Sequence, residues 1–200
     1  ATGSGNEVLG TDDLNSTTTV SSTKHETDTN QSLTVQINES SNEVRNLVRS
    51  ANVITGVYDS TEVSMGTVNL EETDKNQTHS ATITELTEHT TTTKATGNDI
   101  TTFSSSIEAS TSTTTLKELH TKHPRRVETT RTENGASDVS RTGNAIVGDY
   151  TQTTTGSSTF EMRQIHTNQT LTANISQRGT RTSSEQKSGN SVTGDFSLAS

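Results

Sequence analysis

The feature that most constrains this chain is a period of 46 residues. Asparagine recurs at that interval five times, each time after glycine or alanine, at Asn6, Asn52, Asn98, Asn144 and Asn190. A β-branched apolar residue follows two positions later, at Val8, Ile54, Ile100, Ile146 and Val192. Glycine stands two positions further on in four of the five units, and Thr102 replaces it in the other. Self-similarity at one fixed period is typical of stacked repeats.

The period divides the chain into four full units and two partial ones. The full repeats are residues 5–50, 51–96, 97–142 and 143–188, residues 1–4 end a preceding repeat, and residues 189–200 begin another. These units differ at most positions, yet none has gained or lost a residue. Flexible spacers tolerate length changes, whereas stacked units must keep their side chains in register. We therefore expect an ordered array, of which this chain is a window.

Composition favours β structure over a conventional core. Threonine supplies 44 residues and serine 27, whereas only 24% of the chain is hydrophobic and 2% is aromatic. Threonine is β-branched and suits a pleated surface. Proline occurs once and cysteine is absent, so the chain lacks the abundant proline of mucin-like stalks and has no disulfides. We expect an all-β fold that continuous backbone hydrogen bonding stabilises.

A second marker divides three of the four full units in half, and the third unit has Lys122-His123-Pro124 there instead. The segments 29–32, 75–78 and 167–170 share an Asn-Gln pair, and alternating apolar triples follow the first and third, at Leu33/Val35/Ile37 and Leu171/Ala173/Ile175. Because Asn and Gly tolerate positive φ, both markers predict turns. Two elongated architectures fit. One is a stacked β-hairpin meander with four strands of about ten residues per repeat, and the other is a β-solenoid with one coil, or two of about 23 residues, per repeat.

The charge pattern and the absence of catalytic motifs exclude several functions. The formal net charge is −9 without long charged blocks, which disfavours nucleic-acid or anionic-membrane partners, and no apolar run is long enough to insert in a membrane. No nucleophile elbow, phosphate loop or zinc-binding His-Glu-x-x-His is present, so we expect no enzyme and no cofactor. His120 and His123 are interpreted as a solvated cluster rather than metal ligands, and Asp149 and Asp195 as turn residues rather than calcium ligands.

The clearest chemical signal is the N-glycosylation sequon. It occurs at the same repeat position at Asn30, Asn76 and Asn168, and elsewhere at Asn15, Asn38 and Asn174. The alternative is that these asparagines only form turns. Patterns such as Thr111/Thr113/Thr115 also suggest an ice-binding solenoid, but they change position between repeats. Carboxylates such as Glu71, Glu72 and Glu85 are expected to keep strand edges from aggregating.

The segment Thr142 to Thr155 resembles the Thr/Ser-rich tandem repeats of giant bacterial surface proteins, notably those of planctomycetes, where such tracts accompany Rhs-type regions. The resemblance implies a very long, secreted, glycosylated and fibrous protein. We therefore expect a structural segment of an extracellular or cell-surface fibre, whose partners are copies of itself, neighbouring repeats and covalent glycans. The alternative is an adhesin stalk that projects a binding domain outside this segment.

Overall fold

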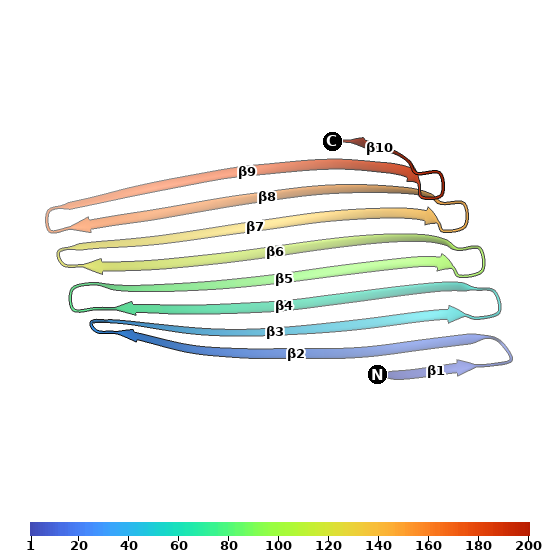
Figure 1. The fold of residues 1–200 in the computed structure, drawn as a ribbon, viewed down its shortest axis with the longest axis horizontal. Helices are drawn as coiled ribbons and strands as arrows, with labels where there is room; N and C mark the ends of the chain where they lie inside the picture. Colours follow the sequence, from blue (N-terminus) through green and yellow to red (C-terminus); the bar gives the residue numbers. More distant parts are fainter.

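The computed structural model describes residues 1–200 as a single open sheet of ten antiparallel strands without helices (Figure 1). The strands are β1 (Thr2–Asn6), β2 (Thr11–Asn30), β3 (Leu33–Asn52), β4 (Val57–Lys75), β5 (Ser80–Asn98), β6 (Phe103–Lys122), β7 (Arg125–Asn144), β8 (Asp149–Asn168), β9 (Leu171–Asn190) and β10 (Asp195–Ala199). Each strand pairs with the next one in the sequence. The fold is therefore a hairpin meander, and the solenoid alternative is wrong because no coils stack in parallel.

The predicted strand length was also wrong. Strands β2 to β9 each span 19 or 20 residues, so 46 residues contribute two long strands rather than four short ones. Ladders between strands account for 146 of the 154 backbone hydrogen bonds. Within each long arm, no residue adopts the positive φ that a tight turn needs; such residues occur only in the connections. Threonine-rich arms therefore continue as strands until a turn residue ends them.

In this register, residues that are 46 positions apart lie directly across from each other, with one strand between them. Asp13 pairs with Ser50, and Ser50 pairs with Asp59. The same relation continues through the sheet, since Asp59 pairs with Thr96 and Thr96 with Ser105. Equivalent positions therefore form straight columns across the strands, without a register shift.

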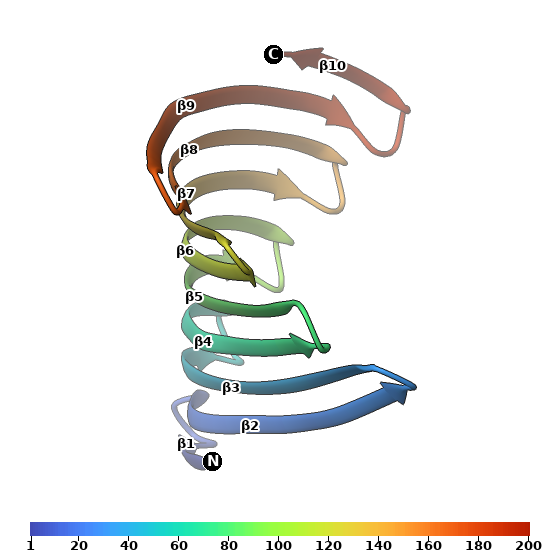
Figure 2. The same cartoon turned by 90° about the vertical axis from the view of Figure 1, so that its left-hand side faces the viewer.

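The two faces of the sheet differ in composition and shape. Figure 2 shows the long strands bowed, so the sheet has a concave and a convex face and is also twisted. Side chains alternate between faces, and the pairing places 30 of the 37 threonines of β2 to β9 on one of them, the threonine face. In β8, Thr151 to Arg163 are exposed at every odd position, and Gln152 to Gln164 are half-buried at every even position. We assign the crowded, half-buried face to the concave side.

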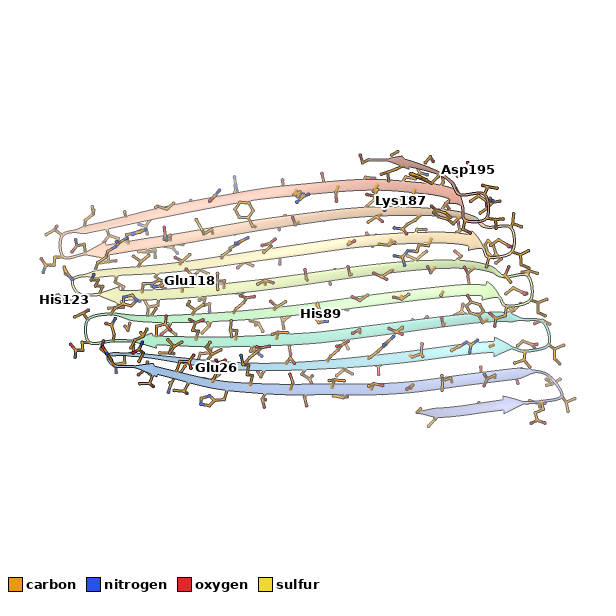
Figure 3. All side chains as sticks on the ribbon, viewed as in Figure 1. Glu26, His89, Glu118, His123, Lys187 and Asp195 are labelled. Carbon is orange, nitrogen blue, oxygen red and sulfur yellow. The ribbon has the colours of Figure 1, made fainter.

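By the strand pairing, the concave face holds both apolar triples and the side chains of Glu26, His89, Glu118 and Lys187. These four side chains are labelled in Figure 3. This face has no conventional core, because Ala81 is the one buried hydrophobic residue. Rings instead cover glycines on neighbouring strands: Phe160 lies over Gly179, and a Cβ added to Gly97 would lie 2.7 Å from the Tyr58 ring. Such aromatic–glycine pairs protect an otherwise bare backbone.

Candidate functional site: the asparagine turns

The asparagine turns are the four-residue connections 7–10, 53–56, 99–102, 145–148 and 191–194, each of which follows one of the five marker asparagines. In every turn the asparagine Oδ1 accepts hydrogen bonds from the backbone N–H groups two and three residues later. For Asn98 these donors are Ile100 and Thr101, both at 2.9 Å. The five marker asparagines do not adopt positive φ. Their side chains act as acceptors for the turn, much as an N-cap residue does for a helix.

The same side chains also connect successive turns. The Nδ2 group of Asn98 donates to the carbonyl of Thr55, in the previous asparagine turn, at 2.9 Å. Equivalent bonds join Asn52 to Leu9, Asn144 to Thr101 and Asn190 to Val147, at 3.0 Å each. A backbone bond accompanies each of them; for example, Asp99 N–H donates to the Gly56 carbonyl at 2.8 Å. The turns therefore form a hydrogen-bonded ladder along one side of the sheet, where the strands end.

The last residue of each turn adopts a left-handed conformation. Gly10, Gly56, Gly148 and Gly194 have φ between 69° and 85°. Thr102 occupies the same position with φ 57°, although β-branched residues rarely adopt this conformation. Its hydroxyl partly compensates by contacting the Oδ1 of Asn144 at 3.2 Å and accepting from the N–H of Ile146 at 3.1 Å.

Replacing Thr102 with glycine is expected to raise the free energy of unfolding by about 1 kcal/mol, since left-handed strain of about 1–2 kcal/mol is removed and weak hydroxyl bonds are lost. Urea denaturation measures the change. Thr101→Gly is the control, because Thr101 does not have positive φ and the substitution should destabilise the turn there. Equal stabilisation of both variants would contradict this interpretation.

The connections at the opposite ends of the strands are the polar turns, residues 31–32, 76–79, 123–124 and 169–170. The sequon residues Asn30 and Asn168 end strands beside these turns and are exposed, whereas Asn76 is half-buried and its Oδ1 accepts from Thr78 and His79. Asn15, Asn38 and Asn174 are exposed within strands, on the threonine face. The structure therefore separates the six sequons into a turn group and a strand group. A cis peptide bond precedes Pro124.

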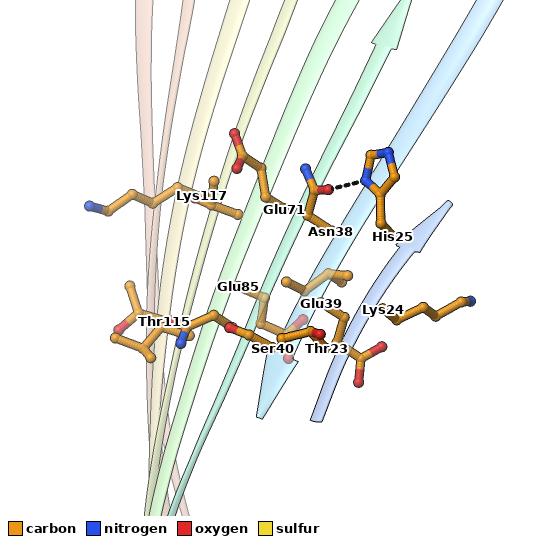
Figure 4. A pocket seen from close by; sticks show the side chains of 14 residues that line it. Thr23, Lys24, His25, Asn38, Glu39, Ser40, Glu71, Glu85, Thr115 and Lys117 are labelled. Carbon is orange, nitrogen blue, oxygen red and sulfur yellow. Dashed lines mark hydrogen bonds between the residues drawn. The ribbon is translucent and has the colours of Figure 1, made fainter. Parts of the chain in front are cut away.

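A depression of about 630 Å³ lies across β2 to β6 (Figure 4) and is lined mostly by polar residues. At its margin His25 Nδ1 contacts Asn38 Oδ1 at 2.5 Å, and His25 Nε2 lies 3.4 Å from the Thr27 hydroxyl. This order of groups resembles a nucleophile, a base and an orienting amide. However, all three residues are exposed, and strand N–H groups lie in the plane of the sheet, so none is aimed at an oxyanion above the face.

The other candidate ligands lie apart or have structural partners. The ring of His120 stacks on that of His79 with centroids 6.0 Å apart, whereas His123 lies at the tip of a polar turn (Figure 3). Asp149 accepts a hydrogen bond from Asn190 Nδ2 at 2.7 Å, and Asp195 accepts one from Thr193. No group of three or more His, Asp or Glu side chains is arranged to hold a metal ion. No apolar helix of membrane-spanning length occurs.

Two ion pairs on the sheet are short and largely accessible to solvent. Lys24 Nζ lies 2.7 Å from Glu26, and Arg45 lies 2.6 Å from Glu62. The hydrogen bond and charge of Lys24 hold the pKa of Glu26 below its ordinary value, and Glu26 in turn raises the pKa of Lys24. Exposed pairs of this kind contribute little to stability.

Lys24→Ala is expected to raise the pKa of Glu26 toward its ordinary value of 4.5. Because the folded-state pKa is lowered, the stabilisation that this pair gives is present above the ordinary pKa of Glu26 and is lost as pH falls through the folded one. A carboxyl carbon NMR titration measures both midpoints. Lys94→Ala is the control and should leave the Glu26 titration unchanged, and an unchanged titration in Lys24→Ala would contradict the assignment.

No family model matches this sequence, and no curated relative matches it. Three solved structures show distant backbone similarity. The ferric yersiniabactin uptake receptor of Yersinia pestis has a TM-score of 0.48 at 6% identity over 92% of this chain and 36% of that one. A major outer membrane protein of Thermus thermophilus has a TM-score of 0.31 at 7% identity over 73% and 85% of the two chains. A pore forming protein has a TM-score of 0.24 at 6% identity over 99% and 100%. The chain spans about a third of the first of these proteins, and similarity this weak carries no functional argument.

Proposed function

We propose that this chain is a structural segment of a long extracellular filament, in which the 46-residue repeat adds two strands at a time to one continuous sheet. The observation that carries the proposal is the register. Residues that are 46 positions apart lie in straight columns, as Asp13, Asp59 and Ser105 do. Each further unit therefore pairs in the same register as the one before, and the sheet extends without a change of geometry.

The small core supports the same proposal. With Ala81 as the one buried hydrophobic residue, stability depends on strand ladders and stacked turns, which lengthen with the chain, rather than on a closed interior of fixed size. A filament of this kind has a mechanical or matrix-forming role. Its placement at the cell surface follows from the resemblance to threonine-rich surface repeats.

Glycan attachment is a separate part of the proposal. Exposed Asn30 and Asn168 beside the polar turns offer accessible amides. Intact mass of protein from its native source tests this point: an excess over the 21.4 kDa polypeptide that maps to these sequons is expected. A mass that matches the bare chain would remove glycosylation and leave the filament proposal unaffected.

Electron microscopy of the full-length protein separates a filament from an adhesin stalk. The proposal predicts continuous filaments, longer than one chain. Single rods that each end in a globular tip would contradict it and favour the stalk.

A further inference from the structure

Eight apolar side chains of the asparagine turns form an apolar ridge along one side of the sheet, where the strands end. They are 56% to 86% exposed and comprise Val8, Leu9, Val53, Ile54, Ile100, Ile146, Val147 and Val192. The polar turns, at the opposite ends of the strands, contain no Val, Ile, Leu, Met, Phe or Tyr. Both sets of turns connect the same strands. The composition of the strands therefore does not explain why only the asparagine turns carry large apolar side chains. Exposed apolar side chains that gather on one side of a protein are typical of an interaction site.

The ridge is ordered rather than a set of separate loops. Hydrogen bonds from Asn52, Asn98, Asn144 and Asn190 connect each turn with the previous one. The β-branched side chains also pack along the ridge: a Cβ added to Gly56 would lie 2.7 Å from Ile100 Cγ1. Equivalent side chains therefore recur every two strands, about 9.6 Å apart at the usual strand spacing.

We propose that this ridge pairs with the same ridge of a second copy of the chain, about a two-fold axis. A partner with a matching two-strand period engages every turn at once, and another copy has that period by construction. Charge permits the contact, because Glu7 and Asp99 are the only charged residues among the 20 of the asparagine turns. Since the sheet is twisted (Figure 2), the two paired ridges wind around each other.

The length of the ridge sets the strength of the pairing. A stable interface buries on the order of 800 Å² per partner, and each added repeat adds one or two exposed apolar side chains. Pairing should therefore be weak for the five turns of this chain and strengthen steeply in longer arrays. It rests on the proposed filament, whose lateral contact it defines.

Sedimentation equilibrium of the 200-residue chain tests the pairing. Because five turns pair weakly, the wild type should dimerise at high concentration, up to about 0.5 mM, and the triple variant Ile54→Thr, Ile100→Thr, Ile146→Thr should weaken dimerisation about tenfold or more. The control replaces three apolar residues of similar exposure elsewhere, Val48→Thr, Ile107→Thr and Ile175→Thr, which are 54%, 56% and 47% exposed. This control should dimerise like the wild type. A wild type that stays monomeric at the highest concentration, or equal weakening by both variants, would overturn the proposal.

Single cysteines locate the contact, since the chain has none of its own. Under mild oxidation Ile100→Cys, at the central turn, should form a disulfide-linked dimer, and Gln77→Cys, at a polar turn, should not. A dimer through Gln77→Cys alone, or cross-linking of Ile100→Cys only to Ser110→Cys on the concave face, would contradict ridge-to-ridge pairing. These results are distinct from failure of the filament itself, which would show as a sheet whose length does not grow with added repeats.

Discussion

Replacing Gly56 with alanine is expected to lower the free energy of unfolding by about 3 kcal/mol. Two costs combine. Gly56 has φ +75°, which an L side chain rarely adopts, and the added Cβ would lie 2.7 Å from Ile100 Cγ1 and 2.9 Å from Ile100 N in the next turn. Urea denaturation followed by circular dichroism measures the loss.

Gly194→Ala is the matched control. Gly194 has φ +81° in an equivalent turn, but nothing lies within 4 Å of its added Cβ. The control should therefore lose about 1–2 kcal/mol from backbone strain alone. The difference between the two variants measures how tightly one turn packs on the next. Equal losses would show that the turns do not stack as described.

Replacing Asn98 with alanine is expected to cost about 3 kcal/mol, because three hydrogen bonds are lost together. Two of them cap its own turn, at Ile100 and Thr101, and the third reaches the Thr55 carbonyl of the previous turn. Thermal and urea unfolding of the variant measure the sum.

Two further variants divide that sum. Asn6 makes only the two bonds within its own turn, to Val8 and Leu9, so Asn6→Ala should cost less than Asn98→Ala by about 1 kcal/mol. Asn98→Asp keeps the acceptor oxygens and removes the Nδ2 donor, so it should retain the capped turn and lose the connection to Thr55. If Asn98→Asp were as stable as the wild type, the inter-turn bond would contribute nothing.

Much of the fold was predictable from local patterns. Threonine-rich composition and period-two triples such as Leu33/Val35/Ile37 predicted strands, and the all-β meander is confirmed as one of the two expected architectures. Both markers fall at connections between strands. These features depend on neighbouring residues only, and a single sequence is enough to recognise them.

Strand length was not predictable in the same way. Interior residues such as Gly66 and Gly135 look like breaks in a strand, but each lies in an uninterrupted ladder, and the ring of His89 covers Gly66. A glycine in a strand indicates either a turn or a close contact from a neighbouring strand. Only the pairing register distinguishes the two, and that register was not known from the sequence.

The hydrogen bonds that the marker asparagines donate to the previous turn could not be predicted from the sequence, for a related reason. Positive φ was the expected reason for Asn at these turns, but glycine or threonine adopts it four residues later. The bond from Asn98 to the Thr55 carbonyl spans 43 positions. It becomes visible only once residues 46 apart are known to be neighbours.

The axial rise per repeat tests the central claim most directly. X-ray fibre diffraction, or cryo-electron microscopy of arrays with four, eight and twelve repeats, measures it. Two strands per 46 residues predict a strand spacing of about 4.8 Å along the filament and a growth of about 9.6 Å for each added repeat. A growth of about 19 Å per repeat, as four strands would give, or a length that does not change with repeat number, would contradict the account.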